Sequence, residues 1–530
     1  MKTHTTLLIT TIAALVLSGC AEAQQSNSSA KEESFISIDD RDKFSVIYND
    51  PFSYSKPMMS TDSRIGEALI KEINKSTVSI DFAIYGLRNQ DEVINALKAA
   101  QERGVQVRGV VDMNVDGLNY YSDTPNLIDE IKSVKSDYKA DLKKRDEGEI
   151  YSNPFWSAPV GFKGPVSCVG YSLPNNRAII SAQASREKII FQGDIMHNKF
   201  FIFDRLTVWT GSCNISDSGT GGYNANVACL IRSTNIANCY TEEFEQMYIS
   251  ERYHKTKKVL VKSTNTVLAN GTKVALYFSP QDKAADKAIR PLLQAARETI
   301  DVAVFFLTHK TITGDLIDAH QRGVKVRVLL DATGAKNEYT KLQFLREAGI
   351  PVKIENWGGK MHMKSAVIDN HHLILGSMNW TSAGNYSNDE NTIIITSKTL
   401  SSEFSGFYQE LWSSIPEKWL SGRPDPESKE SGTSWKDGVD NDFDGKIDSD
   451  DPGCSVTPPP LPDLPPYKTV PKQEGQMLIK GNINSKGKKY YFVPTNSFYN
   501  RTKINVRYGE RWFPSIEEAK QSGWRRPPGK

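Results

Sequence analysis

The sequence has almost no net charge, because 65 Lys and Arg residues stand against 63 Asp and Glu residues and leave +2 over 530 residues. The whole-chain charge therefore identifies no partner, and charge has to be examined locally. Beyond residue 20 no stretch approaches eighteen apolar residues, so no transmembrane helix is expected in the mature chain. Hydrophobic content of 38% and charged content of 24% are ordinary for a soluble globular protein, and the chain is too long for one ordinary domain.

Cysteine is also scarce, with six residues at positions 20, 168, 213, 229, 239 and 454. If Cys20 is modified, as argued next, five remain, an odd number for an oxidising compartment. Cys229 and Cys239 are close enough in sequence to pair, and Cys213 lies inside the motif GSCN described below. The sequence leaves the connectivity open.

The first twenty residues, MKTHTTLLITTIAALVLSGC, form an export signal with a basic start, a short apolar core and small residues before Cys20. Its end resembles the lipobox of bacterial lipoproteins, which implies that Cys20 becomes the lipidated first residue of the mature chain. Residues 21–44 begin with a polar stretch and are expected to form a tether. We therefore expect an exported, membrane-anchored lipoprotein in the periplasm or on the cell surface.

An internal repeat organises the centre of the chain. The apolar stretch VSIDFAIYGL (78–87) is similar to IDVAVFFLTH (300–309), and ERGVQVRGVVD (102–112) is similar to QRGVKVRVLLD (321–331). A helical pattern lies between the members of each pair, so each copy predicts a βαβ unit with a parallel, buried sheet. We place the first repeat at 45–255 and the second at 265–420, packed about a pseudo-two-fold axis.

The first repeat is longer than the second. Asp112 precedes His197 by 85 residues, whereas Asp331 precedes His362 by 31. The difference predicts an insertion at about 115–185 that is aromatic and rich in Pro and Gly. A long loop in such a position is usually functional, so we expect a lid or substrate wall.

Each repeat carries the same polar motif. HNKFFIFD (197–204) and HMKSAVID (362–369) share the spacing His-x-Lys-x4-Asp, and Gly-Ser-x-Asn follows each after six residues. Residues two apart on a strand share a face, so the histidine and lysine of each motif are expected to point together. Two imidazoles, two ammonium groups and two carboxamides around one point would bind a phosphate, attack it and protonate its leaving group. The expected phosphate-binding residues are Lys199, Lys364, Asn214 and Asn379.

The doubled motif resembles the phospholipase D superfamily, and the resemblance covers about 375 residues. It implies a metal-independent, two-step reaction in which one histidine forms a covalent phosphohistidine that water or an alcohol then resolves. By the family's usual order, His197 is expected to be the nucleophile and His362 the acid and base. Asp204 and Asp369 are expected to hold the motif in place rather than to act in catalysis.

The chain departs from the family in one place. The family usually has a carboxylate or amide about 28 residues after the histidine, which orients an imidazole. In the second repeat this residue is Glu390, whereas the first repeat has Ala225 there, between Asn224 and Asn226. Glu390 is therefore expected to orient one histidine, either in its own repeat or across the pseudo-dyad. Either an asparagine holds the other histidine, or the two histidines differ in role.

An Asp-rich segment at 436–454 follows the repeats. Its spacing fits a calcium-binding loop, with the expected ligands Asp440, Asp442, Asp444, Asp448 and Asp451. The flanking residues do not resemble EF-hand helices, so an acidic linker without an ion is the alternative. Because the segment is far from the paired motifs in sequence, we expect any calcium here to be structural.

The last part of the chain is a proline-rich linker (455–475) and a small basic module (476–530). The module has twelve Lys and Arg residues, three Glu residues and nine aromatic residues. It resembles a module appended to secreted bacterial nucleases, and its composition suits an anionic polymer such as nucleic acid. A packing or cell-wall module with a solvated charged face is an equal alternative.

The sequence thus predicts an exported α/β phosphodiesterase without a catalytic metal. The lipid anchor and the aromatic insertion favour a phospholipase D acting on phospholipids, whereas the basic module favours a nuclease cleaving DNA or RNA. A phosphatidyltransferase that makes cardiolipin ranks third, because such enzymes usually carry N-terminal membrane helices and no membrane helix is expected in this mature chain. A surface protein that only binds its ligand is disfavoured, because both motifs are intact.

Overall fold

The computed structural model describes residues 36–39, 44–146 except 116 and 118, 171–172, 178–179, 193–260, 266–442 except 338, 446–455, and most positions from 479 to 527. The predicted signal peptide with Cys20, the middle of the predicted insertion, Asp444 and nearly all of the proline-rich linker lie outside the described residues. Within the expected tether at 21–44 the structure describes residues 36–39, which form β1, and Phe44, which begins β2.

The first repeat is built on an eight-stranded sheet. In spatial order its strands are β1 (Ile36–Asp39), β2 (Phe44–Asn49), β12 (Asn226–Arg232), β10 (Thr207–Gly211), β9 (Lys199–Phe203), β3 (Ser79–Ile84), β5 (Gln106–Val111) and β6 (Val134–Ser136). Only β3, β5 and β6 pair in parallel, and the other neighbours are antiparallel. The predicted parallel βαβ unit is therefore present, but within a mixed sheet.

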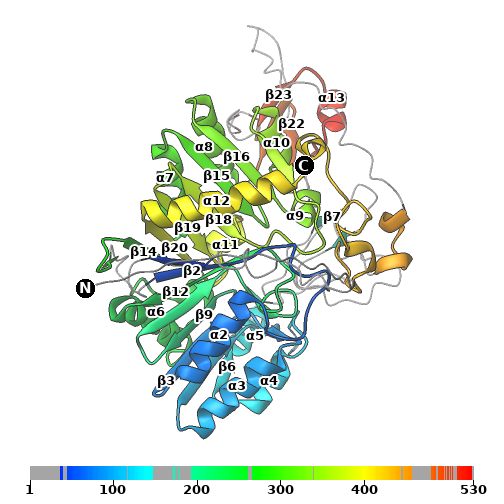
Figure 1. Ribbon diagram of the computed structural model, residues 1–530. Coiled ribbons are helices and arrows are strands. Elements are labelled where there is room, and N and C mark those ends of the chain that lie inside the picture. Colours follow the sequence, from blue (N-terminus) through cyan, green and yellow to red (C-terminus); the bar gives the residue numbers. More distant parts are fainter. Residues whose placement is uncertain are drawn as a thin grey trace, which may run out of the picture. The chain divides into compact units, whose positions relative to one another are not determined.

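The second repeat has an eight-stranded sheet with the same order and directions. Its strands are β13 (Thr266–Val267), β14 (Lys273–Ser279), β20 (Glu390–Thr396), β19 (His372–Gly376), β18 (Lys364–Ile368), β15 (Thr299–Val304), β16 (Lys325–Leu330) and β17 (Val352–Ile354). Each repeat also has its own cluster of buried apolar side chains. The duplication in the sequence is thus a duplication of the fold (Figure 1).

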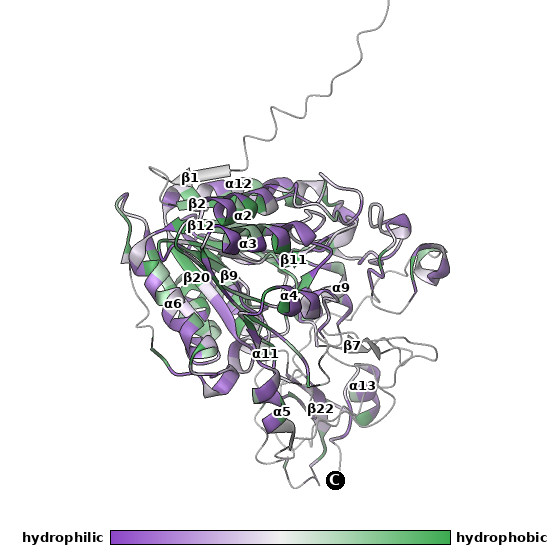
Figure 2. Ribbon diagram, turned by 90° about the horizontal axis from the view of Figure 1, so that it is seen from below, coloured by the Kyte–Doolittle hydropathy of each residue, from purple (hydrophilic) through white to green (hydrophobic). Residues whose placement is uncertain are grey.

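Helices flank both sheets, and the apolar positions on each explain which side is buried. In α3 (Asp91–Glu102), for example, Val93, Leu97 and Ala100 are buried at helical spacing. The first repeat has α2 (Arg64–Lys75), α3, α4 (Thr124–Glu130), α5 (Tyr138–Asp146) and α6 (Thr234–Tyr248). The second has α7 (Arg290–Ala295), α8 (Lys310–Gln321), α9 (Ala332–Lys336), α10 (Leu342–Glu347), α11 (Ser382–Tyr386) and α12 (Lys398–Ser414). Figure 2 shows the hydrophobic colour on strands such as β12 and β20 and both colours on α6.

The matched strand orders locate the extra length of the first repeat. Strand β6 corresponds to β17, so both repeats have the segment that leads to this strand. The additional residues lie between β6, which ends at Ser136, and β9, which begins at Lys199. The insertion therefore begins after residue 136 and not at about 115. Strand β6 has a counterpart in the second repeat, so the segment up to the end of β6 is part of the repeated unit.

Two parallel backbone bridges join the repeats at their centre. Met196 pairs with Asp389, and Ala225 pairs with Met361. The backbone N–H of His197 donates to the Asp389 carbonyl at 2.9 Å, and that of His362 donates to the Ala225 carbonyl at 3.0 Å. Each repeat thus holds the histidine of the other, as a pseudo-two-fold arrangement requires.

The basic C-terminal module contains a three-stranded sheet of β21 (Ile479–Ile483), β22 (Lys489–Phe492) and β23 (Arg511–Phe513), followed by α13 (Ile516–Gln521). Its small core includes Phe513 and Trp524 and extends to Phe344 of α10. Lys310 of α8 donates to the Ile483 carbonyl at 2.7 Å. The module therefore packs on the second repeat.

Cys213, Cys229 and Cys239 are buried, and none of Cys213, Cys229 and Cys454 forms a disulfide within the part of the chain that the structure describes. The pairing of Cys229 with Cys239 that the sequence allows is wrong, since no disulfide joins Cys229 on β12 to Cys239 on α6. Among the described residues, no helix has the length and apolar character needed to cross a membrane.

Candidate active site

The two motif histidines lie just before equivalent strands, His197 before β9 and His362 before β18. The lysine of each motif turns back toward its histidine. Lys199 Nζ donates to the His197 carbonyl at 2.8 Å, and Lys364 Nζ donates to the His362 carbonyl at 2.5 Å. The ammonium group of each motif therefore lies against the backbone of its own histidine.

A carboxylate orients the first histidine. Glu390, at the start of β20 in the other repeat, lies with its two oxygens 2.8 and 2.9 Å from Nδ1 of His197. Glu390 is fully buried, and Ser377 donates to it at 2.7 Å. A fixed hydrogen bond at Nδ1 leaves Nε2 to face the pocket.

An amide occupies the corresponding place beside the second histidine. Nδ1 of His362 lies 3.2 Å from Oδ1 of Asn226 and 3.0 Å from the Ser212 carbonyl oxygen. Ser212 donates to Asn226 at 2.8 Å, as Ser377 does to Glu390. The equivalent of Glu390 is therefore Asn226, the first residue of β12, and not Ala225, which the residue count aligns with it.

Burial sets the charges of this cluster. It lowers the pKa of His197 and of His362 well below the ordinary histidine value, and the ammonium groups of Lys199 and Lys364 lower both further. Burial likewise lowers the pKa of Lys199 to about 7. Burial raises the pKa of Glu390 to about 8. These are the groups of an anion-binding site whose proton affinities depend on what is bound.

Both histidines line one pocket together with Asn214 and Asn379. Asn214 donates to the Tyr121 hydroxyl at 2.8 Å. Four of the six residues expected around one phosphate thus line one pocket, and the other two, Lys199 and Lys364, each donate to the backbone carbonyl of a lining histidine.

Asp204 and Asp369 lie away from the pocket at the far ends of their strands. Asp204 accepts from the backbone N–H groups of Thr77, Val78 and Ser79, and Asp369 does the same for residues 297–299. These bonds lower the pKa of both carboxyls. Each aspartate fastens the loop that leads into a central strand.

Aromatic residues that the sequence reasoning did not single out form the pocket walls. The ring of Tyr85 lies 5.3 Å from that of His197, and the ring of Phe305 lies 5.1 Å from that of His362. Tyr85 and Phe305 occupy the same position of the aligned repeats, which is the signal that could have found them. The other aromatic lining residues are Tyr120, Tyr121, Tyr223 and Phe306.

The Asp-rich segment also reaches this pocket, although it is far away in sequence. Val439, Asp440 and Asn441 line it. The Asn441 carbonyl accepts from Lys360 and Thr333, and Tyr223 donates to Asp437 at 2.5 Å. The segment is therefore part of the pocket wall.

The expected calcium ligands are divided in their contacts. Carboxylates of Asp440 and Asp442 cluster with that of Glu427, but Asp442 also pairs with Lys336 at 2.9 Å. Asp448 accepts from the Gly438 N–H at 3.2 Å, and Asp451 accepts from the Gly453 N–H. Calcium in this segment stays a prediction.

A second buried cluster lies behind His197. His254, at the start of the short helix η2 (His254–Thr256), contacts Asp389, whose carbonyl accepts from the His197 N–H. Lys257 pairs with the same carboxylate at 2.8 Å. His254 has no counterpart motif, so sequence reasoning missed it.

Two equivalent α/β units that bring paired histidines, lysines and asparagines to one pocket define a phosphodiester hydrolase of the two-histidine type. The model of the family "Cardiolipin synthase, PLD-like domain" matches residues 69–248 and 289–412. The chain belongs to the phospholipase D superfamily.

Individual relatives match part of the chain. "Phospholipase D" of Rickettsia bellii (strain RML369-C) is 35% identical over 144 residues, which are 27% of this chain and 71% of the relative. "Mitochondrial cardiolipin hydrolase" of Homo sapiens is 33% identical over 131 residues, 25% of this chain and 52% of the relative. Among solved structures, the phospholipase D family member Nuc of Salmonella typhimurium is 25% identical, has a TM-score of 0.26, and is matched over 27% of this chain and 97% of its own.

Proposed function

We propose that the protein hydrolyses the headgroup phosphodiester of a phospholipid, with His197 as nucleophile and His362 as acid and base. Nε2 of His197 attacks phosphorus while the bond from phosphorus to the headgroup oxygen breaks, and His362 gives that oxygen a proton. Water then loses a proton to His362 and attacks phosphorus, the P–N bond breaks, and His197 is regenerated.

The unequal partners of the histidines support this order of roles. A carboxylate at Nδ1 of His197 stabilises the positive charge that its imidazole gains on forming the P–N bond. The neutral amide of Asn226 gives His362 no such stabilisation, which suits a group that exchanges a proton. The contact of Glu390 with His197 is the observation that carries the assignment.

Lys199, Lys364, Asn214 and Asn379 are proposed to hold the phosphate oxygens. An anion beside a buried lysine favours its charged form, so binding restores the charge that burial of Lys199 disfavours. With these charges and the two imidazoles, the chemistry at phosphorus is complete without a metal ion, and we propose that none takes part in it.

The pocket walls favour a phospholipid over a nucleic acid. Six aromatic residues and apolar Pro57, Ile195 and Val439 line it. Of the lining cations, Arg88 is paired with Asp217 at 2.7 Å and Lys360 is bound to Asn441 and Thr333. A groove for a nucleic-acid strand carries cations that follow the backbone, whereas this wall adds Asp440.

The basic C-terminal module keeps a nuclease as the second candidate. Its Lys480, however, donates to the carbonyls of Tyr499 and Thr502 at 2.8 and 2.9 Å, and burial lowers the pKa of Lys489 to about 8. Lys480 is thus engaged within the module, and Lys489 lies over the rings of Trp524 in the module and Phe344 in the second repeat. Transfer of a phosphatidyl group to an alcohol, as in cardiolipin synthesis, is the third candidate and uses the same intermediate.

The experiment compares substrates in parallel, with protein that begins at residue 21. Vesicles of phosphatidylcholine, phosphatidylglycerol or cardiolipin, and single- and double-stranded DNA, are each incubated with the protein and with His197→Asn. The protein is expected to release the headgroup from the vesicles, and His197→Asn is expected to release none. DNA cleavage without headgroup release would contradict the proposal, and lipid products that contain a second alcohol would indicate transfer.

Export as a lipoprotein is the companion proposal. It predicts that labelled fatty acid is incorporated at Cys20 in a bacterial host and that Cys20→Ala abolishes the label and releases the protein from membranes. Incorporation that survives Cys20→Ala would contradict it.

A further inference from the structure

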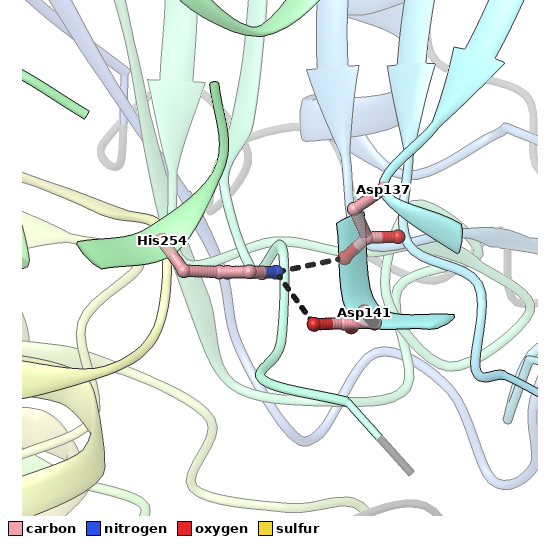
Figure 3. Close-up of side chains that lie close together, drawn as sticks. All are labelled: Asp137, Asp141 and His254. Atoms are coloured by element: carbon pink, nitrogen blue, oxygen red, sulfur yellow. Dashed lines mark ion pairs between the residues drawn. The ribbon is translucent and has the colours of Figure 1, made fainter. Parts of the chain in front are cut away.

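Three buried side chains from distant parts of the first repeat meet behind the pocket. Asp137 lies immediately before α5 and Asp141 one turn later, so both carboxylates project from the same side of the helix. His254 approaches them from η2, with its imidazole directed at both carboxylates (Figure 3). All three are at least nine-tenths buried, with exposures of 0%, 1% and 5%.

Their spacing is wider than that of hydrogen bonds. Nε2 of His254 lies 3.3 Å from Oδ2 of Asp137 and 3.6 Å from Oδ1 of Asp141. Charged N–H···O bonds are normally about 2.7–2.9 Å long. Nε2 of His254 and the facing Oδ2 of Asp137 have no hydrogen-bond partner in the described part of the chain, whereas the facing Oδ1 of Asp141 accepts from the Asp194 N–H at 3.4 Å. Buried polar atoms nearly always have a hydrogen-bond partner, and a bound ion is one explanation for those that have none.

The same spacing fits two ligands of one small cation. Zinc binds histidine nitrogen and carboxylate oxygen at about 2.0–2.2 Å in tetrahedral geometry, which separates neighbouring ligand atoms by roughly 3.3–3.6 Å. The facing ligand atoms of Asp137, Asp141 and His254 all lie within 4.8 Å of one another. One nitrogen and two carboxylates are donors that zinc accepts.

The far side of the imidazole is arranged as metal-bound histidines usually are. Nδ1 of His254 lies 3.0 Å from Oδ2 of Asp389. This contact is an ion pair without hydrogen-bond geometry, so the carboxylate orients the ring by its charge and leaves Nε2 as the ligand atom. The backbone of His254 has a φ of 53°, which is uncommon for a residue other than glycine.

The charges around the cluster also favour a dication. His254 and Lys257 face four buried carboxylates, those of Asp137, Asp141, Asp389 and Glu243. Asp112 lies nearby and adds a fifth carboxyl, which accepts from the Met196 N–H. Unbalanced buried charge is costly. A dication bound to neutral His254 would reduce this excess of negative charge, because the carboxylates of Asp137 and Asp141 together balance its two positive charges.

We propose that Asp137, Asp141 and His254 bind a divalent transition-metal ion, best matched by Zn²⁺, behind the active site. The ion does not line the substrate pocket. Through His254 and Asp389 it fixes the backbone carbonyl that accepts from the His197 N–H and the residue that precedes Glu390. Its role is therefore to position His197, and the inference does not depend on the choice of substrate.

The test measures metal content directly. Protein that begins at residue 21 is produced without a histidine tag, exposed to Zn²⁺, freed of loose metal and analysed by plasma mass spectrometry. We expect about one tightly bound zinc per wild-type chain. The content should fall to background in His254→Gln and in Asp141→Asn, and it should persist in His371→Gln, which changes an exposed histidine. Asp440→Asn should also retain zinc, which separates this site from the Asp-rich segment.

A second measurement needs only the wild-type protein, so it decides the question even if a variant fails to fold. Removal of the ion by prolonged dialysis against a chelator should lower the melting temperature, and an equimolar amount of Zn²⁺ should restore it. A folded wild-type protein that takes up no zinc, and whose melting temperature zinc leaves unchanged, would overturn the proposal. Zinc uptake that His254→Gln and Asp141→Asn leave intact would also overturn it.

Discussion

Nδ1 of His197, in the first repeat, lies 2.8 Å from the carboxylate of Glu390, in the second. The equivalent contact of His362 is made by the amide of Asn226. The fold is duplicated, but the two halves of the site are not chemically equal. A carboxylate can stabilise an imidazolium or a phosphohistidine, and an amide cannot do so to the same degree.

Replacement of this carboxylate should therefore cost activity without unfolding the protein. In Glu390→Gln the amide preserves the shape of the contact, but kcat should fall about 10²–10⁴-fold, because the charge on His197 is no longer balanced. Asn226→Ala is the matched control in the other half and should lose less. The measurement is steady-state kinetics beside near-UV circular dichroism, and equal losses in the two variants would contradict the asymmetry.

The same residue should shape the pH dependence. Burial raises the pKa of Glu390 to about 8, and below that pH its carboxyl is protonated and accepts poorly from Nδ1. Burial lowers the pKa of Lys199 to about 7, and above that pH the lysine loses the positive charge that attracts the phosphate. kcat/KM should thus be bell-shaped, with a maximum at about pH 7–8. Glu390→Gln should lose the fall on the acidic side and keep the alkaline one. An acidic fall that persists in this variant would assign it to another group.

The repeated motifs made much of this site predictable, since His197, His362 and their lysines are encoded at fixed spacing in local sequence. The partner of His362 could not be found by counting, because the connection from Gly211 to Asn226 is one residue longer than that from Gly376 to Glu390. Strand pairing, which sets Gly211 opposite Ala228 and Gly376 opposite Thr392, corrects the count.

Other features depend on contacts that local sequence does not encode. His254 meets Asp137 and Asp389 across more than a hundred residues of chain, and nothing in the second repeat mirrors it. The Asp-rich segment was interpreted from its own composition, whereas its place beside the pocket depends on Lys360 and Tyr223. Tertiary packing decides both.

Asp204 offers a test of structure without chemistry. In Asp204→Asn the hydrogen bonds from the backbone of residues 77–79 weaken, and the free energy of unfolding should therefore fall. The loss should be limited to about 1–2 kcal/mol, because the site is partly exposed to solvent. kcat should not change. Urea unfolding and kinetics on one preparation check this, with Asp129→Asn, on an exposed helix surface, as the neutral control. A loss of kcat without a loss of stability would give Asp204 a role in the reaction.

The roles of the two histidines can be separated with a substrate whose leaving group needs no proton. With a bis(4-nitrophenyl) phosphate, departure of nitrophenolate does not require an acid, but hydrolysis of the phosphohistidine still requires a base. His362→Asn should then release one nitrophenolate per active site in a burst and stop, and His197→Asn should release none. Mass spectrometry at alkaline pH should find the phosphoryl adduct on the peptide with His197.

The opposite pattern would exchange the roles. A burst in His197→Asn, with the adduct on His362, would make His362 the nucleophile, and the carboxylate of Glu390 would then serve the acid and not the nucleophile. Full turnover in either variant would contradict a mechanism with two histidines. Because both variants keep the lysines and asparagines of the pocket, a loss of the burst can be assigned to the missing imidazole once unchanged binding of inorganic phosphate has been measured.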